Sequence, residues 1–229
     1  MAYKLSSVVP WGRNKQEYIK MFKLSDQDIK KKIASFGDGP ASFNSESKGN
    51  VTSFDPLYQF SKKQISNRIN ETRDIVIKQT KENISNFIWK NIKSIKELEE
   101  IRMNAMNMFL KDFENGKDEG RYIPHELPNK TDIEDGYYDI ALSSHFLILY
   151  SQLGLDFHIK SIDEMLRIAK EVRIFPILDL DAKESNLLSS LIDNYKEKFI
   201  VSIEETTYEF QKGGNKMLMI KHKEECRWF

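Results

Sequence analysis

The sequence predicts an α/β fold: a doubly wound, mostly parallel sheet with helices on both faces and a closing C-terminal hairpin. Short apolar runs, typical of buried strands, alternate along the chain with stretches of helical spacing. Strands separated by helices imply a parallel sheet whose faces those helices cover. Gly213-Gly214-Asn215 lies between two apolar runs and is a strong turn signal, which adds one antiparallel strand.

The first elements follow from these patterns. Tyr18, Phe22 and Ile29 lie roughly in phase for a helix, while the apolar runs starting at Ile33 and Val51 are short enough for strands. The expected elements are a helix over 14–32, a strand over 33–36, a helix over 40–47 and a strand over 51–54.

Residues 61–120 form a long insertion with helical spacing. We expect two helices that meet near Lys93-Ser94. The segment exceeds the few residues usual between sheet elements, even after allowing one crossover helix. We therefore expect a helical lid that sets substrate choice.

Alternation resumes after Gly120. Residues 121–123 are a weak strand and Tyr138 to Ser143 a strong one, while Val172 to Leu178 is apolar enough for a central strand. The remaining expected elements are helices over 156–170 and 184–196 and strands over 199–204 and 216–221.

Composition limits the classes of function. The 229 residues are 40% hydrophobic, so we expect one core and a single domain over 1–229. Basic and acidic residues both number 35, whereas nucleic-acid-binding proteins usually have a basic excess, so no such partner is expected. The single Cys226 excludes an internal disulfide and leaves no cysteine cluster for a metal. Because no run of about 18 apolar residues occurs, we expect a cytoplasmic protein without a membrane partner. A homodimer stays open.

A glycine turn after the first strand is the main chemical signal. Gly37 and Gly39 let the backbone approach a ligand closely, and Pro40 suits the first position of a following helix. Asp55 ends the second strand, where a carboxylate can accept hydrogen bonds from both hydroxyls of an adenosine ribose. The turn and the acid together predict an adenosine-containing ligand.

Two ligand classes use this arrangement. A dinucleotide brings a pyrophosphate, which requires backbone N–H groups and a positive helix end. Here Pro40 removes one donor, Asp38 adds a negative charge, and Ser42 replaces the third glycine of the dinucleotide pattern. S-adenosyl-L-methionine has no phosphate and carries a sulfonium cation, so the residues favour it over NAD.

The chain resembles the class I (Rossmann-fold) S-adenosylmethionine-dependent methyltransferases, and in particular a group of small stand-alone bacterial methyltransferase-like proteins. The resemblance implies a seven-stranded sheet in the order 3-2-1-4-5-7-6. The matching stretches are VVPWGRNKQEYIKMF (8–22), FGDGPASFN (36–44), SFDPLYQFS (53–61), DIALSSHFLILYS (139–151), EVRIFPILDLD (171–181) and YEFQKGGNKML (208–218).

The resemblance also implies the cofactor contacts. Gly37, Asp38 and Gly39 would lie against the methionine and sulfonium portion, and Asp55 would bind the ribose. Pro56, Leu57 or Tyr58 would line the adenine slot. Relatives often place an aspartate where this chain has Ile123, so recognition of adenine would fall to the backbone, His125 or Glu126.

Candidate substrate and catalytic residues follow from the topology, because the carboxyl ends of the strands face the ligand crevice. His145 is either a base or a packed structural histidine, and Asp179 and Asp181 either contact substrate or cap the next helix. The candidates are Ser143, Ser144 and His145 after the fourth strand, Asp179 and Asp181 after the fifth, and Tyr208, Gln211 and Asn215 in the hairpin.

The N-terminal segment, within residues 1–32, is a predicted cap over the cofactor. Trp11 and Arg13 surround a Pro-Gly pair, and the Arg13 guanidinium matches a carboxylate such as that of the methionine end. The alternative is a surface arginine beside a packed tryptophan.

Three functions stay open: methyl transfer to a small molecule, an intramolecular attack on S-adenosylmethionine that releases methylthioadenosine, and a binding module without catalysis.

Overall fold

The computed structural model describes residues 4–7, 9–47 and 49–223. Val8 and Cys226 lie outside these residues. The strands form one seven-stranded sheet in the order β3-β2-β1-β4-β5-β7-β6, which confirms the predicted order. Neighbouring strands from β3 to β5 are parallel, and β7 is antiparallel to both β5 and β6. This strand order with an antiparallel β7 is typical of the class I methyltransferase fold. The strands are β1 Ile33–Phe36, β2 Val51–Phe54, β3 Tyr122–Ile123, β4 Tyr138–Ser144, β5 Ala169–Phe175, β6 Phe199–Glu205 and β7 Lys216–His222.

The two long helices of the insertion begin at serine caps. Ser61 and Ser94 accept hydrogen bonds from the backbone N–H groups of Gln64 and Glu97, which satisfies donors that the first turn of a helix leaves free. Ser94 is thus the start of the second predicted helix of the insertion. The helices are α1 Lys15–Met21, α2 Lys62–Glu82, α3 Ile95–Asp118, α4 Leu155–Ile168 and α5 Leu188–Tyr195.

The predicted helix over 40–47 is wrong, because this segment forms successive turns. Ser45 and Ser47 donate their hydroxyls to the carbonyls of Ser42 and Phe43. Asn44 donates instead to Ser53 and to the carbonyl of Arg121. Such side-chain bonds compete with helical hydrogen bonding.

The predicted strand over 172–178 is displaced by three residues, since β5 covers 169–175. It ends before Pro176, which has no N–H to continue the ladder. The predicted helix over 184–196 is shorter as well, since α5 begins at Leu188.

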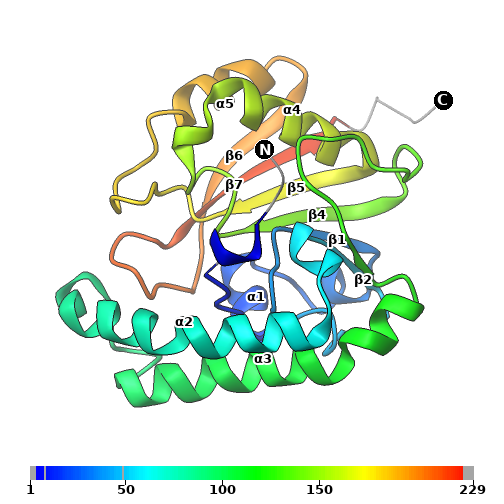
Figure 1. Ribbon diagram of the computed structural model, residues 1–229. Coiled ribbons are helices and arrows are strands. Elements are labelled where there is room, and N and C mark those ends of the chain that lie inside the picture. The colour runs from blue at the N-terminus through cyan, green and yellow to red at the C-terminus, as the bar shows by residue number, and fades with distance from the viewer. Residues whose placement is uncertain (1–3, 8, 48, 224–229) are drawn as a thin grey trace.

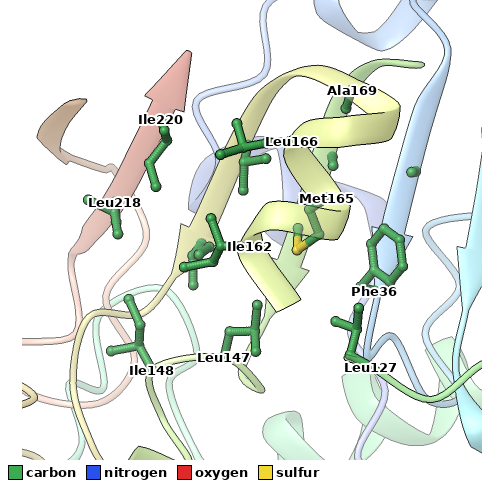
Figure 2. Close-up of a cluster of buried hydrophobic side chains, with 14 of the residues drawn as sticks. Phe36, Leu127, Leu147, Ile148, Ile162, Met165, Leu166, Ala169, Leu218 and Ile220 are labelled. Carbon is green, nitrogen blue, oxygen red and sulfur yellow. The ribbon is translucent and has the colours of Figure 1, made fainter. Parts of the chain in front are cut away.

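Helices cover both faces of the sheet. On one face α4 and α5 pack on the strands, and Figure 2 shows Ile162, Met165 and Leu166 of α4 beside Leu218 and Ile220 of β7. All five side chains are almost fully buried. The opposite face is covered by α1 and the 41–43 segment.

The insertion forms a pair of long helices beside β3. Figure 1 shows α2 and α3 side by side, away from α4 and α5 across the sheet. Leu57 and Tyr58 pack into this pair with Phe109 and Phe113 of α3 and Tyr122 of β3. The insertion is therefore anchored at the end of β2, next to the candidate site. Across the described part of the chain, no helix combines the length and apolarity that a membrane crossing requires.

Candidate active site

The glycine turn lies directly after β1. Gly37 and Gly39 have φ values of 71° and 53°, in the left-handed region that favours glycine. A Cβ on Gly39 would meet no atom within 4 Å, so the space above this residue is open. The Gly39 N–H donates across to Asp55 at the end of β2, at 2.8 Å. The turn is thus fastened to the neighbouring strand while its outer side stays free for a ligand.

Asp55 is held by two backbone donors. Its Oδ2 accepts from the Gly39 N–H and its Oδ1 from the Leu57 N–H at 2.7 Å. Burial and, to a smaller extent, the charge of Asp38 raise the pKa of Asp55 to about 6, although the two backbone hydrogen bonds act to lower it. Each oxygen retains capacity for another donor. The carboxylate is therefore positioned to accept two hydroxyls, and ionisation would be favoured by them.

Asp38 is occupied within the protein. Oδ1 accepts from the hydroxyls of Tyr18 at 2.7 Å and Ser35 at 2.5 Å, and Oδ2 accepts from Ser53 at 2.6 Å. Burial raises its pKa, which the three hydroxyl bonds oppose. Asp38 thus ties β1, β2 and α1 together beneath the glycine turn, and its expected contact with a cofactor stays a prediction.

The N-terminal segment lies over the glycine turn. A Cβ on Gly12 would come within 2.1 Å of the Pro40 carbonyl oxygen, so this close approach requires glycine. The Ser42 N–H also donates to the Arg13 carbonyl at 3.0 Å. Trp11 and Arg13 are thereby fixed at the mouth of the site, as a cap would be.

Arg13 presents an unmatched charge. Among the described residues, its guanidinium makes no hydrogen bond or ion pair, and its Nε is buried without a partner. Burial lowers the pKa of Arg13, and the charge of Arg102 lowers it further. The guanidinium nevertheless stays charged at neutral pH. Glu17, whose charge raises the pKa of Arg13, is already paired with Arg102, so the half-buried Arg13 guanidinium fits an anionic ligand group.

Ser144 ends β4, His145 follows it, and both face the same space. His145 has a φ of 53°, and its Nδ1 lies 3.0 Å from the Ser144 Oγ. Burial lowers the pKa of His145 well below its usual value, and the charges of Arg13 and Arg102 add to this shift. The imidazole is therefore neutral at physiological pH and serves as a hydrogen-bonding group.

A cavity of about 610 Å³ opens at the carboxyl ends of β1, β2 and β4. This is the crevice in which parallel α/β sheets bind ligands, and the volume is within the range of small-molecule sites. We call it the first cavity. Its lining includes Trp11, Arg13, Gly37, Asp38, Gly39, Asp55, Pro56, His125, Glu126, Ser144 and His145.

A second cavity of about 450 Å³ adjoins the first. Both are lined by Trp11, Arg13, Val76, Gln79 and His145, so these residues stand at the shared wall. Val76 and Gln79 belong to α2, which gives the insertion a direct part in the site. The second cavity is further lined by Arg102, Phe87, Phe175, Tyr208, Phe210 and Gln211.

An ion cluster borders the second cavity. Arg102 Nη1 donates to Glu17 Oε2 at 2.6 Å, and Arg102 Nη2 lies 3.3 Å from the Tyr208 hydroxyl. The Tyr208 hydroxyl donates to Glu17 Oε1 at 3.0 Å. This cluster joins α1, α3 and the β6–β7 hairpin, which are far apart in sequence.

Comparison with known proteins gives the family. No protein-family model matches the chain. Over 222 residues, however, it is 37% identical to the uncharacterized protein MJ0045 of Methanocaldococcus jannaschii, covering 95% of this chain and 97% of that protein. The chain belongs to the MJ0045 family.

Solved structures of S-adenosylmethionine-dependent methyltransferases also align with this member of the MJ0045 family. One from Aquifex aeolicus is 11% identical, with 91% of this chain and 88% of that chain covered and a TM-score of 0.40. A magnesium protoporphyrin IX methyltransferase from Synechocystis PCC 6803 is 11% identical, with 91% and 83% covered and a TM-score of 0.44.

Two predicted cofactor residues face the protein interior. The Leu57 side chain is fully buried against α2 and α3, and only its backbone N–H serves the site, through Asp55. Ser143 is likewise fully buried, and its hydroxyl accepts from the Leu147 N–H at 3.4 Å. Leu57 lies in the turn that follows β2, and Ser143 points to the side of β4 opposite Ser144, so the structure places neither side chain in the first cavity.

The predicted substrate residues in the loop after β5 and in the hairpin also differ in whether they line a cavity. Asp179 accepts from the backbone N–H groups of Asp181 and Lys183, so its carboxylate holds its own turn and neither contacts the cavities nor caps α5. Asn215 contributes its carbonyl to the hairpin, accepting from Thr206. Tyr208 and Gln211 do line the second cavity, as expected for substrate-binding candidates.

Sequence reasoning missed Glu17, Tyr18 and Arg102. The helical spacing of the sequence could have singled out Arg102. It lies on the same buried face of α3 as Leu98, Met106, Phe109 and Phe113. An arginine within an apolar stripe needs a partner, but its identity is visible only in the fold.

Proposed function

We propose that this MJ0045-family chain is an S-adenosylmethionine-dependent methyltransferase that acts on a small molecule. One observation carries the proposal: Asp55 stands at the carboxyl end of β2, inside the first cavity, with both carboxylate oxygens fixed by backbone N–H groups. A carboxylate in this place binds the paired hydroxyls of an adenosine ribose. Burial disfavours the ionised form of the free Asp55 carboxyl and so raises its pKa. Hydrogen bonds from two ribose hydroxyls would stabilise that ionised form.

The other lining residues suit the remaining parts of the cofactor. The open face of Gly39 leaves room for the backbone to approach the ligand, and Arg13 would bind the methionine carboxylate. His125 and Glu126 line the first cavity together with Pro56, where adenine would lie, and the His125 Nε2 is buried without a hydrogen-bond partner among the described residues. S-adenosylmethionine has no phosphate group. It therefore needs neither the backbone N–H that Pro40 lacks nor a glycine turn free of the negative charge of Asp38.

When bound, S-adenosylmethionine supplies an activated methyl group: the acceptor's lone pair forms the new bond to carbon, the carbon–sulfur bond breaks with its electrons left on sulfur, and the acceptor's proton passes to water. The protein's task is to align the acceptor opposite sulfur and to exclude water. Trp11 and His145 stand at the shared wall of the two cavities, where the acceptor would meet the methyl group. Neutral His145, bonded to Ser144, would orient the acceptor through a hydrogen bond.

The second cavity supports transfer to a separate acceptor. An intramolecular attack within S-adenosylmethionine needs no additional compartment, whereas a bound acceptor needs one that shares a wall with the cofactor site. The volume of about 450 Å³ and the shared residues meet that requirement.

A product assay tests the proposal. The protein would be incubated with methyl-¹³C S-adenosylmethionine and the small-molecule fraction of a cell extract, and the products analysed by mass spectrometry. We expect S-adenosylhomocysteine and a labelled, methylated small molecule. Methylthioadenosine would indicate intramolecular attack instead, and neither product from a protein that binds the cofactor would indicate a binding module.

A further inference from the structure

The second cavity carries an excess of positive charge. Arg13 and Arg102 both line it, and no Asp or Glu is found among the described residues of its lining. Glu17, behind the wall, neutralises one of the two cations through its ion pair with Arg102. The two cations and the single carboxylate leave one net positive charge at this cavity.

Arg102 is the more informative of the two cations. Its side chain is 1% exposed, it lines only the second cavity, and its Nε is buried without a hydrogen-bond partner. Arg13 stands at the shared wall and can meet an anionic group from either side. The terminal nitrogens of Arg102 already bond Glu17 and Tyr208, which leaves its Nε as a costly unmatched donor. The Arg13 guanidinium makes no such bonds among the described residues, and its planar fork matches a carboxylate.

The rest of the cavity is aromatic and amide-lined. Phe87 and Phe210 stack with ring centroids 4.8 Å apart, and Phe175 meets Tyr208 edge-on at 5.8 Å. These rings suit an apolar or aromatic body. Neutral side chains that can bond polar substituents are Gln79, Asn83, Asn86 and Gln211.

We propose that the methyl acceptor is a small organic carboxylate with an aromatic or other apolar body, held in the second cavity with its carboxylate near Arg102 and Arg13. The identification of this carboxylate as the acceptor rests on the proposed methyltransferase function. S-adenosylmethionine itself carries a net positive charge, so when bound in the first cavity it would strengthen the attraction of the second cavity for an anion.

Matched acid and amide pairs test this charge preference. Calorimetric titrations would compare benzoate with benzamide, 2-naphthoate with 2-naphthamide and indole-3-acetate with indole-3-acetamide, on protein saturated with S-adenosylhomocysteine. We expect at least one acid to bind at least about tenfold more tightly than its amide, a difference of about 1.4 kcal/mol. Equal affinities within every pair, or no binding by any acid, would overturn the proposal.

Variants assign the preference to the cluster. Glu17→Gln keeps the capping box of α1, since glutamine also serves there, and it removes the counter-charge of Arg102, so the acid preference should increase. The double variant Glu17→Gln/Arg102→Met removes the buried pair together, which avoids leaving one charge unpaired, and the preference should decrease at least about tenfold relative to Glu17→Gln. An unchanged preference in the folded double variant contradicts the assignment to Arg102.

Lys20→Met is the matched control. It removes one positive charge from the same helix as Glu17, but Lys20 is exposed and outside the cavity lining, so the preference should not change. Binding of S-adenosylhomocysteine is measured separately on each protein. If acids are preferred but S-adenosylhomocysteine does not bind, the proposed function fails while the anion site stands. If S-adenosylhomocysteine binds and acids are not preferred, only the present inference fails.

Discussion

Lowering the pH should weaken the binding of S-adenosylhomocysteine, because the ribose hydroxyls need an ionised Asp55. The pKa of this carboxyl in the free protein is about 6, raised by burial and by Asp38. Two hydroxyls donating to the carboxylate would lower its pKa in the complex, so binding below pH 6 requires release of a proton. The affinity should therefore fall about tenfold between about pH 7 and about pH 5, and should be nearly constant above about pH 7.

The stability of the free protein depends on pH in the opposite direction to ligand affinity. A carboxyl whose pKa is raised on folding favours the protonated folded state, so its contribution to stability is present at low pH and is lost as the pH rises through about 6. The ligand thus relieves a cost that the free protein carries at neutral pH. Bound S-adenosylhomocysteine should accordingly raise the melting temperature more at pH 7 than at pH 5.

Calorimetric titration at both pH values measures the effect, and Asp55→Asn is its control. The amide does not titrate and presents only one acceptor oxygen, so its affinity should be at least about tenfold below wild type at pH 7 and nearly independent of pH. Because one backbone N–H would lose its acceptor, thermal melts must show that the variant is folded. The reasoning is refuted if wild type binds equally well at both pH values, or if Asp55→Asn keeps the same pH dependence.

Three further predictions concern the N-terminal cap and the shared wall. Gly12→Ala would place a Cβ 2.1 Å from the Pro40 carbonyl oxygen, so we expect the free energy of unfolding to fall by about 1–3 kcal/mol, with a lower melting temperature. Binding of S-adenosylhomocysteine should also weaken, and normal affinity would show that the segment is not a cap. Arg13→Met should weaken that binding at least about tenfold without lowering the melting temperature, because the guanidinium has no partner among the described residues, and a destabilised variant with normal affinity would contradict this. His145→Gln should slow product formation. At saturating S-adenosylmethionine the wild-type pH–rate profile should show no inflection near pH 6.5, because burial holds the pKa of His145 well below its usual value; an inflection that the variant abolishes would contradict a neutral His145.

Much of the fold was predictable because its signals are local. The strands over 33–36 and 51–54 are found as predicted, since short apolar runs bounded by polar or glycine residues leave few alternatives. Asp55 could be placed because a strand end fixes the position of the next residue. The helix expected over 40–47 failed since serine and asparagine side chains bond the backbone there, an outcome that apolar spacing does not encode.

The finer site could not be predicted because it depends on partners distant in sequence. Asp38 accepts hydrogen bonds from hydroxyls of α1 and β2, and Arg102 pairs with Glu17, which lies 85 residues earlier in the chain. Likewise, Leu57 and Ser143 lie next to site residues, yet their side chains face the core. The Leu57 side chain faces the core because it packs against α2 and α3, which are distant in sequence.

The most direct measurement is a crystal structure of the protein with S-adenosylhomocysteine. The account predicts that both ribose hydroxyls lie within hydrogen-bonding distance of the Asp55 carboxylate, about 2.5–3.0 Å, with the homocysteine carboxylate at Arg13 and adenine beside Pro56 and His125. A ligand bound elsewhere, or one whose ribose does not contact Asp55, would contradict the central claim that this carboxylate organises the cofactor site.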